Sequence, residues 1–506
     1  MILNKPETSK LALMSYLIEQ HKSISKEFLT DKFHISLSTL KRRIHSINDE
    51  LKTIKEFHYI EILDQTNGYY WHNPTPFNDR YVLKKINLSY HLDSIQFQLF
   101  QKIFLGSNYT LPNLAKILSI SLPYLYHLLF YANKFLAKFS IKIEYAKNLD
   151  KISISGSALT IRLFESYFFW SISQDIHWPF KSITVDELYS CFSEKELKNL
   201  FNFSLSKQSK YLYSLAVVHH LHFFEKEQLQ LDSTFKEILV VFQETNNLSC
   251  PLEKLLTTHY QTEPDSQKLK NEYLFFNFIS RLFDSYKDIE DIQIEIGEKL
   301  FILDNELITY CRQLIQSLSE KFPTIEALPN YFKLKFKLLY FLTLYFSNIF
   351  YVHFDSSYLK DFMLINPNLN TMNSKAFKES KNFIDNFIKE KPLKNDQIIS
   401  KFHSTLLYSQ IYYVISNVID DQLTIYIHFS KNMFGESYIE AELYKLFGKE
   451  NIIIVPTIEE AQIVISDFYE YKYKNENYFY FEDIKDKKCW KELFSFVQEH
   501  RLNMMS

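Results

Sequence analysis

The chain has 506 residues, which is too many for one ordinary core and predicts about three to five domains. Its formal net charge is −3, so the chain as a whole is not a polycation and any surface that binds nucleic acid has to be local. Only 6 residues are glycine, far below the usual ~7% of soluble proteins. This composition argues against glycine-rich phosphate loops and dinucleotide folds, and it favours a mainly helical protein.

The first 75 residues have the pattern of a winged helix-turn-helix. Residues 10–20 predict a helix, and Ser25 is a suitable N-cap for a second helix that ends at Phe33. After a turn at residues 34–36, an apolar stripe with helical spacing is formed by Leu40, Ile44, Ile47 and Leu51. Two strand-like runs then flank the dipeptide Asn67-Gly68, which indicates a hairpin wing. We therefore predict a winged helix-turn-helix over residues 1–75.

The third helix of this module is predicted to present short polar and basic side chains opposite its apolar stripe. These candidate DNA contacts are Ser38, Thr39, Lys41, Arg42, His45 and Ser46. Residues 1–55 hold ten Lys or Arg and six Asp or Glu, a local net charge of +4. A helix with this surface fits the major groove of duplex DNA. The alternative is a solvated, charged helix within a helical bundle.

The same pattern recurs 85 positions further along the chain. Ile35 corresponds to Ile120 at this offset, and Leu40 corresponds to Leu125. Further pairs are Leu29 and Leu114, Thr30 and Ala115, Phe33 and Leu118, Ile44 and Leu129, Asn48 and Asn133, and Leu51 and Leu136. Two copies that keep the turn and the apolar spacing argue against a chance match. Two adjacent DNA-reading modules predict a transcription regulator.

The second module is predicted over residues 76–160. Its helices are expected at 92–105, 111–118 and 122–138, and its wing is expected from the strands 141–143 and 152–154. Its candidate DNA contacts are Tyr124, His127, Tyr131 and Lys134. Residues 111–151 hold six lysines and two acidic residues, a local net charge of +4, so this module could hold phosphates without reading bases.

The two modules are expected to contribute unequally to DNA binding. We expect Lys41, Arg42 and His45 to read or position the DNA most strongly, while the second module mainly extends the footprint. The alternative is that the second copy only packs against its neighbours.

The middle of the chain is expected to form two helical blocks, 161–287 and 288–395, separated by the charged stretch 286–291. Helices are predicted at 210–225, 232–243, 300–322, 330–353 and 374–388. The longest apolar stretch, 338–354, is interrupted by polar residues and slightly short for a bilayer span of ~20 residues, so we interpret it as a buried helix.

Residues 396–506 change to alternating strands and helices, which predicts a small α/β domain with a parallel sheet. The expected strands are 423–429, 452–455, 461–466 and 478–481, and the expected helices are 438–447 and 490–500.

This order of modules resembles the Mga/AtxA-type regulators, a family of virulence regulators that carry phosphotransferase-regulation domains. The resemblance is most specific at residues 35–51 and 111–136, and it is architectural in the middle of the chain. It implies a mainly α protein with two winged helix-turn-helix domains, two all-helical phosphotransferase-regulation domains and a C-terminal domain like the IIB component of the sugar phosphotransferase system. It further implies a homodimeric or higher oligomeric DNA-binding transcription regulator that binds duplex DNA and responds to sugar supply.

In that family, histidines of the helical blocks can be phosphorylated by the phosphocarrier of the phosphotransferase system. The corresponding candidates are His219, His220, His222 and His353. A phospho-acceptor needs an exposed imidazole nitrogen, and the usual Leu-His-Ile pattern with a following Arg is absent here. The alternatives are histidines satisfied in or near a core, and a metal site formed by His219 and His222, which lacks further nearby ligands.

In the IIB component, the first strand ends at a catalytic cysteine followed by a loop that cradles phosphate. Ser430 stands where that cysteine would be, while Gly435 and Ser437 keep the later Gly and Ser of the loop. A thiolate is far better populated at neutral pH than an alkoxide, so we expect no phosphotransfer and no enzymatic activity here. The expectation is a degenerate domain used for dimerisation or sensing.

The four cysteines lie far apart in the sequence, at Cys191, Cys250, Cys311 and Cys489. This spacing predicts neither a zinc site nor a disulfide framework. The polar N-terminus lacks the apolar core of a signal peptide. We therefore expect a cytoplasmic protein without a cofactor, a metal or a membrane partner. The alternatives are an RNA-binding antiterminator with phosphotransferase-regulation domains, a phosphotransferase-system component and a recombinase with tandem DNA-binding modules.

Overall fold

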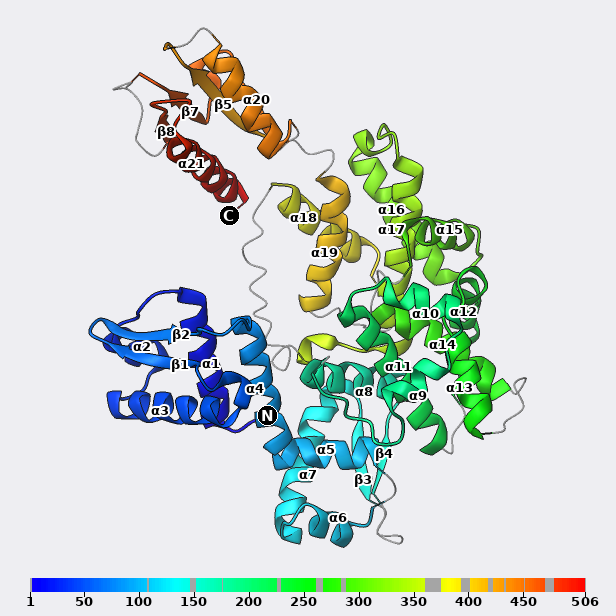
Figure 1. The fold of residues 1–506 in the computed structure, drawn as a ribbon. Helices are drawn as coiled ribbons and strands as arrows, with labels where there is room; N and C mark the ends of the chain where they lie inside the picture. Colours follow the sequence, from blue (N-terminus) through cyan, green and yellow to red (C-terminus); the bar gives the residue numbers. More distant parts are fainter. Residues whose placement is uncertain are drawn as a thin grey trace. The chain divides into compact units, whose positions relative to one another are not determined.

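The protein is mainly helical, as expected, with a small sheet near its C-terminus (Figure 1). The computed structural model describes residues 2–106, 109–145, 152–174, 176–224, 229–260, 267–283, 288–359, 375–392, 401–416, 422–431, 434–449, 451–468 and 477–505. Contacts divide the chain into two compact units. The first unit is Met1–Ile289 with Ser347–Ile365, and the second is Glu290–Phe346 with Asn366–Ser506. The finer division into five domains stays a prediction.

The first module is a winged helix-turn-helix whose helices begin at side-chain caps. Its helices are α1 (Lys5–Gln20), α2 (Lys26–Phe33) and α3 (Leu37–Thr53), and its wing is β1 (Glu61–Gln65) with β2 (Gly68–His72). The Ser25 hydroxyl accepts the Phe28 N–H at 3.2 Å, as predicted for an N-cap. The hairpin turn is displaced from the expected Asn-Gly pair, because Gly68 already pairs with Gln65 as the first residue of β2.

The second module contains one more helix than predicted. The expected helix at 92–105 is confirmed as α5 (Ile95–Leu105), which begins after Ser94, whose hydroxyl caps the Phe97 N–H. The helix before it, α4 (Asp79–Asp93), was not predicted. The remaining elements are α6 (Leu111–Ile117), α7 (Leu122–Leu136), β3 (Lys142–Tyr145) and β4 (Ile152–Ser155).

The helices that follow in the first unit are held together by buried ion pairs. They are α8 (Ala158–Ser173), α9 (Val185–Ser190), α10 (Glu194–Phe201), α11 (Leu205–Phe224), α12 (Ser233–Thr245), α13 (Cys250–Tyr260) and α14 (Gln267–Phe283). Arg162 of α8 binds the Glu272 carboxylate of α14 through two hydrogen bonds, of 2.7 and 3.2 Å. Arg281 binds Asp288 in the same way, at 2.6 and 3.2 Å. The first pair joins α8 to α14, whereas the second joins α14 to a residue seven positions further along the chain. Such buried pairs offset their lost hydration only when their geometry is good.

The helices of the second unit differ from the prediction at several points. They are α15 (Glu290–Phe301), α16 (Glu306–Lys321), α17 (Tyr331–Ser347), α18 (Lys375–Glu390) and α19 (Lys401–Ile415). The helix expected at 300–322 is confirmed as α16 except for its start, because α15 ends at Phe301 and Asn305 caps α16. The helices α15 and α19 were not predicted. Gly297 allows the backbone of α17 to approach α15 closely, since an added Cβ would lie 2.1 Å from the Phe336 carbonyl oxygen.

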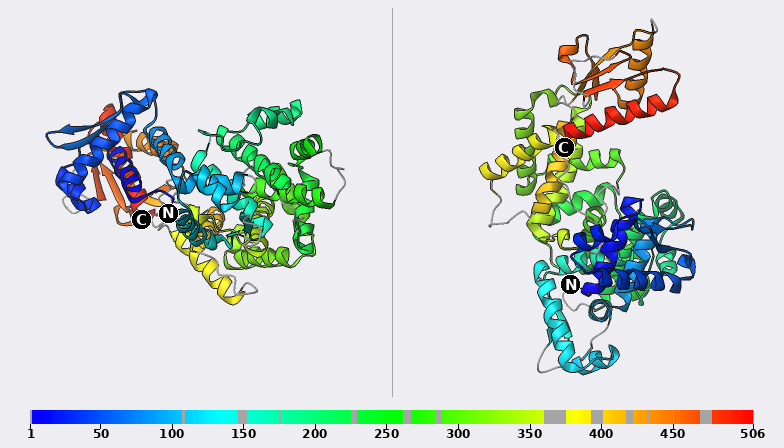
Figure 2. Two further views of the ribbon diagram at one scale, coloured as in Figure 1. Left: turned by 90° about the horizontal axis from the view of Figure 1, so that it is seen from below. Right: turned by 90° about the vertical axis from the view of Figure 1, so that its left-hand side faces the viewer.

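The C-terminal region has the predicted parallel sheet, with both of its helices on one face (Figure 2). The strands β5 (Leu423–His428), β6 (Ile452–Ile454), β7 (Ile463–Ser466) and β8 (Tyr478–Tyr480) lie in the order β6-β5-β7-β8. Ring contacts join Tyr438 of α20 (Gly435–Phe447) to Trp490 of α21 (Lys487–Met505). One apolar core contains residues of both helices and of the sheet.

Within the described residues, no single helix is long and apolar enough to cross a membrane. One bent pair, Leu111–Ile117 with Leu122–Phe139, meets the length and composition test when its two helices are taken together.

Candidate nucleic-acid interface

The repeat predicted from the sequence is present in the backbone and in the helix caps. His34 and Ser119, which are 85 positions apart, both adopt left-handed conformations in the turn, with φ of 50° and 54°. Ser36 caps α3 by accepting the Thr39 N–H, and Ser121 caps α7 by accepting the Tyr124 N–H. Each recognition helix therefore leaves the turn in the same way.

A matched pair of asparagines fixes each wing to its recognition helix. The Asn48 amide donates to the Ile62 carbonyl at 3.0 Å and accepts the Ile62 N–H at 2.8 Å. Asn133 binds Ile143 through the same two bonds, at 3.0 and 2.7 Å. Since both bonds are made to the first wing strand, each asparagine sets the position of a wing beside its helix.

The exposed face of α3 presents most of the predicted DNA contacts. Ser38, Lys41, Arg42 and His45 are exposed, while Thr39 and Ser46 are half-buried. The Ser46 hydroxyl accepts from the Lys10 ammonium at 2.8 Å and donates to Glu50 at 3.1 Å, so it belongs to a network inside the module. The His45 ring lies 3.3 Å from the Asp49 carboxylate on the same face.

Two cations on this face are available to an anionic ligand. No ion pair involves Lys41 or Arg42 in the part of the chain that the structure describes. Some other cations of the module are paired, as Lys26 is with Asp64 at 2.6 Å and Arg80 with Glu19 at 3.0 Å. Within the described residues, the exposed face of α3 thus carries two cations without an ion pair, which suits phosphate contacts.

The exposed face of α7 is aromatic. All four predicted contacts, Tyr124, His127, Tyr131 and Lys134, are exposed. The His127 ring lies between two tyrosines, 6.0 Å from the ring centre of Tyr124 and 4.8 Å from that of Tyr131. No residue of α7 is acidic. This face can therefore approach DNA without charge repulsion, although it offers fewer cations than α3.

Sequence reasoning missed two exposed residues of this face. The offset of 85 places Tyr126 where α3 has Lys41, and Phe130 where α3 has His45. Their exposed fractions are 42% and 66%. The repeat at an offset of 85 positions was the signal in the sequence that could have identified these two residues.

Comparison with known proteins identifies this part of the chain. Residues 80–169 match the family model described as the Mga helix-turn-helix domain. The second module is a Mga-type helix-turn-helix domain. The match confirms the resemblance to Mga-type regulators and supports a DNA-binding transcriptional regulator. The search of curated proteins gave no match.

The candidate histidines lie outside the Mga-type domain and differ in their accessibility. His219 and His220 are buried in α11, with 4% and 2% exposed. Burial lowers the pKa of His220 to about 4, and its Nε2 lies 2.8 Å from the Phe104 carbonyl oxygen. The side chain of His222 lies outside the described part of the structure. His353 is exposed, so it has the accessibility that a phospho-acceptor requires.

His353 lies in a segment that packs on the end of the Mga-type recognition helix. The Phe354 ring stacks on Phe139, directly after α7, with 5.5 Å between ring centres. The Lys138 ammonium lies 5.1 Å from the ring centre of Tyr358. The Thr160 hydroxyl donates to the Val352 carbonyl at 2.8 Å. Residues 348–359 thus connect a candidate input site to a DNA-reading helix.

In the C-terminal domain, a carboxylate occupies the loop after β5. Asp467 accepts the backbone N–H groups of Ser430 and Lys431, both at 2.9 Å, and the Ser430 hydroxyl at 3.1 Å. Burial alone would raise the pKa of Asp467, but these hydrogen bonds lower it overall. The donors that a phosphate would need in this loop therefore already bind an anion of the chain itself.

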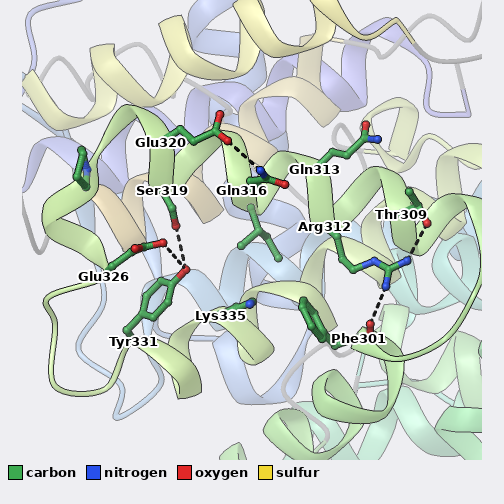
Figure 3. Close-up of a pocket in the computed structure, with 12 residues that line it drawn as sticks. Phe301, Thr309, Arg312, Gln313, Gln316, Ser319, Glu320, Glu326, Tyr331 and Lys335 are labelled. Atoms are coloured by element: carbon green, nitrogen blue, oxygen red, sulfur yellow. Dashed lines mark hydrogen bonds between the residues drawn. The ribbon is translucent and has the colours of Figure 1, made fainter.

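A groove of about 730 Å³ lies between α16 and α17 in the second unit (Figure 3). Arg312 donates to the Phe301 carbonyl and to Thr309, both at 2.9 Å, and the Tyr331 hydroxyl lies 3.0 Å from that of Ser319. Gln316 donates to Glu320 at 2.9 Å. The polar groups of the groove thus largely satisfy one another.

Among the described residues, no cluster of His, Cys, Asp or Glu has the arrangement of a metal site. All four cysteines are free thiols.

Proposed function

We propose that the protein is a cytoplasmic transcription regulator that holds duplex DNA with both helix-turn-helix modules, using α3 as its main cationic contact. The observation that carries this proposal is the free positive charge of Lys41 and Arg42 on a helix whose internal geometry matches that of the Mga-type module. A paired cation would have to give up its partner before it could bind phosphate, whereas these two would not.

Mobility shifts of Lys41→Ala, Arg42→Ala and Lys134→Ala on duplex DNA test this proposal. A variant that no longer neutralises one phosphate should show a slope of log affinity against log salt that is smaller by about 0.9. We expect the two α3 variants to weaken binding more than Lys134→Ala. Lys299→Ala is the matched control, because it removes one exposed lysine from α15, far along the chain from either module.

The proposal fails if Lys41→Ala and Arg42→Ala bind duplex DNA as the control does. An RNA hairpin of matched length is the competing ligand. Stronger binding of that hairpin across the salt series would favour an antiterminator instead.

The link to sugar supply is a second part of the proposal. We propose that the phosphocarrier of the phosphotransferase system phosphorylates His353, because this histidine is exposed and its neighbours contact the end of α7. Incubation with the phosphorylated phosphocarrier, followed by mass mapping, should place the label on His353 and lose it in His353→Ala. No label on His353 would refute this link.

We also propose that the protein acts as a homodimer and catalyses no reaction. Two linked DNA contacts gain affinity because the second contact is effectively intramolecular, and a dimer extends this gain. Sedimentation of the full chain tests the oligomeric state, and a monomer at micromolar concentration would refute the dimer. The occupied loop at Asp467 supports the absence of phosphotransfer, and phosphate recovered on Ser430 would contradict it.

A further inference from the structure

The two recognition helices place different chemistry at corresponding positions. At the offset of 85, α3 has Lys41 and His45, whereas α7 has Tyr126 and Phe130. Phe130 is 66% exposed, although burying such a ring would be favourable. The second module therefore keeps an apolar side chain in solvent at the centre of the face that would read DNA.

The chemistry of a phenyl ring limits what it can recognise on DNA. Phe130 can neither donate nor accept a hydrogen bond, so it cannot read the polar edge of a base. In the major groove, the one apolar group that distinguishes a base pair is the C5-methyl group of thymine, which apolar side chains contact. Phe130 is thus suited to thymine and to no other base.

The rings around Phe130 are positioned before any ligand binds. Tyr126 contacts Tyr145 of the wing strand β3, with 5.8 Å between ring centres, and Phe130 contacts Tyr131 at 5.4 Å. Rings held in this way lose little freedom on binding. Lys134 follows one helical turn after Phe130, where its ammonium can reach a phosphate beside the contacted base.

Charge favours an anionic partner such as DNA over a neutral or basic protein on this face. The sequence of α7 has no acidic residue, and Lys134 and Lys138 lie at its C-terminal end and directly after it. On the adjoining wing strand, Lys142 is paired with Glu144 at 3.0 Å. The face is also continuous with a helix-turn-helix that matches a DNA-binding family model.

We propose that α7 reads thymine-rich DNA through apolar contacts of Phe130 and Tyr126 with thymine methyl groups in the major groove. This inference rests on the proposed function, and it adds the base that the second module selects. The first module supplies most of the cationic contact, and the second supplies discrimination by methyl groups.

The test replaces thymine with deoxyuridine, which removes only the methyl group. The probe is a duplex recovered with the wild-type chain by selection from a random 30-base-pair pool and resynthesised with single substitutions. Each contacted methyl that is removed should weaken binding about fourfold, the effect of exposing one buried methyl group. Phe130→Ala should weaken binding to the thymine probe and should no longer respond to at least one of these substitutions.

The matched control is Phe332→Ala, which removes an equally exposed phenyl ring (68%) from α17 in the second unit. This variant should keep the full response to deoxyuridine. Equal binding of both probes by the wild-type chain would overturn the inference, as would an unchanged response of Phe130→Ala. If Arg42→Ala still weakens binding in that case, the proposed function stands and only this inference falls. If the wild-type chain retains no duplex from the pool, the proposed function itself fails.

The same variants test whether the face instead joins two copies of the chain. Sedimentation without DNA measures the self-association of Phe130→Ala. If this variant no longer self-associates and its response to deoxyuridine is unchanged, the face is a protein interface and the inference is overturned.

Discussion

Replacing Glu272 with glutamine should destabilise the first unit by about 3–5 kcal/mol. The Arg162 guanidinium and the Glu272 carboxylate are each only 1% exposed. Glutamine keeps the shape of the side chain but removes its charge, so the buried guanidinium would lose the carboxylate that it binds through two hydrogen bonds. Changing both partners, in Arg162→Met with Glu272→Leu, removes both charges and should cost far less than the sum of Arg162→Met alone and Glu272→Leu alone. The expected coupling between the two sites is therefore about 3 kcal/mol or more.

Hydrogen exchange of the α8 and α14 amides in the full chain measures the opening free energy of this region in each variant. The control is Glu295→Gln, which breaks the pair of Glu295 with Lys299, whose side chains are 52% and 45% exposed. It should change the opening free energy by less than about 0.5 kcal/mol. A cost below about 1 kcal/mol for Glu272→Gln, or a double variant as unstable as the sum of the two single variants, would refute the reasoning.

Three further changes test other parts of the structure. Burial lowers the pKa of His220 to about 4, below the unfolded value near 6.5, so stability should fall as the pH drops from 6.5 towards 4. Between pH 7 and 5 this histidine should account for about 2 kcal/mol of lost stability, and His220→Gln should remove that part of the pH dependence in urea unfolding. Gly68→Ala should displace the first wing and weaken DNA binding, because its Cβ would lie 1.9 Å from the Ile24 carbonyl oxygen at φ +130°; unchanged affinity in a mobility shift would contradict this. Asp467→Ala should destabilise the C-terminal domain by about 1–3 kcal/mol, because two N–H groups lose their acceptor; thermal unfolding followed by Trp490 fluorescence should show a lower midpoint, and no change would refute the role of this carboxylate.

The features that were predicted correctly from the sequence are formed by interactions between residues close together in the chain. The Ser25 cap, the turn and the apolar stripe of α3 follow from hydrogen bonds and spacing within a few residues. The parallel sheet follows from strands that alternate with helices. Such signals need no knowledge of distant partners.

The features that were missed depend on partners far along the chain. The carboxylate at Ser430 comes from Asp467, 37 positions later, and no spacing rule connects the two. Phe354 reaches Phe139 across more than two hundred residues. The helix starts after Ser94 and Asn305 are a separate, local case, because each of these side chains caps the first turn of the helix that follows it.

The placement of His353 suggests which half of the DNA interface a regulatory signal would affect. Its neighbour Phe354 contacts Phe139, and Tyr358 contacts Lys138, so both contacts lie at the end of α7. A phosphoryl group on His353 would add negative charge to the segment whose Phe354 and Tyr358 contact Phe139 and Lys138. It would therefore act on the aromatic reader and leave the cationic face of α3 unchanged. Under this scheme, Arg42→Ala should weaken DNA binding by the same factor with and without phosphorylation, because its side chain lies on α3.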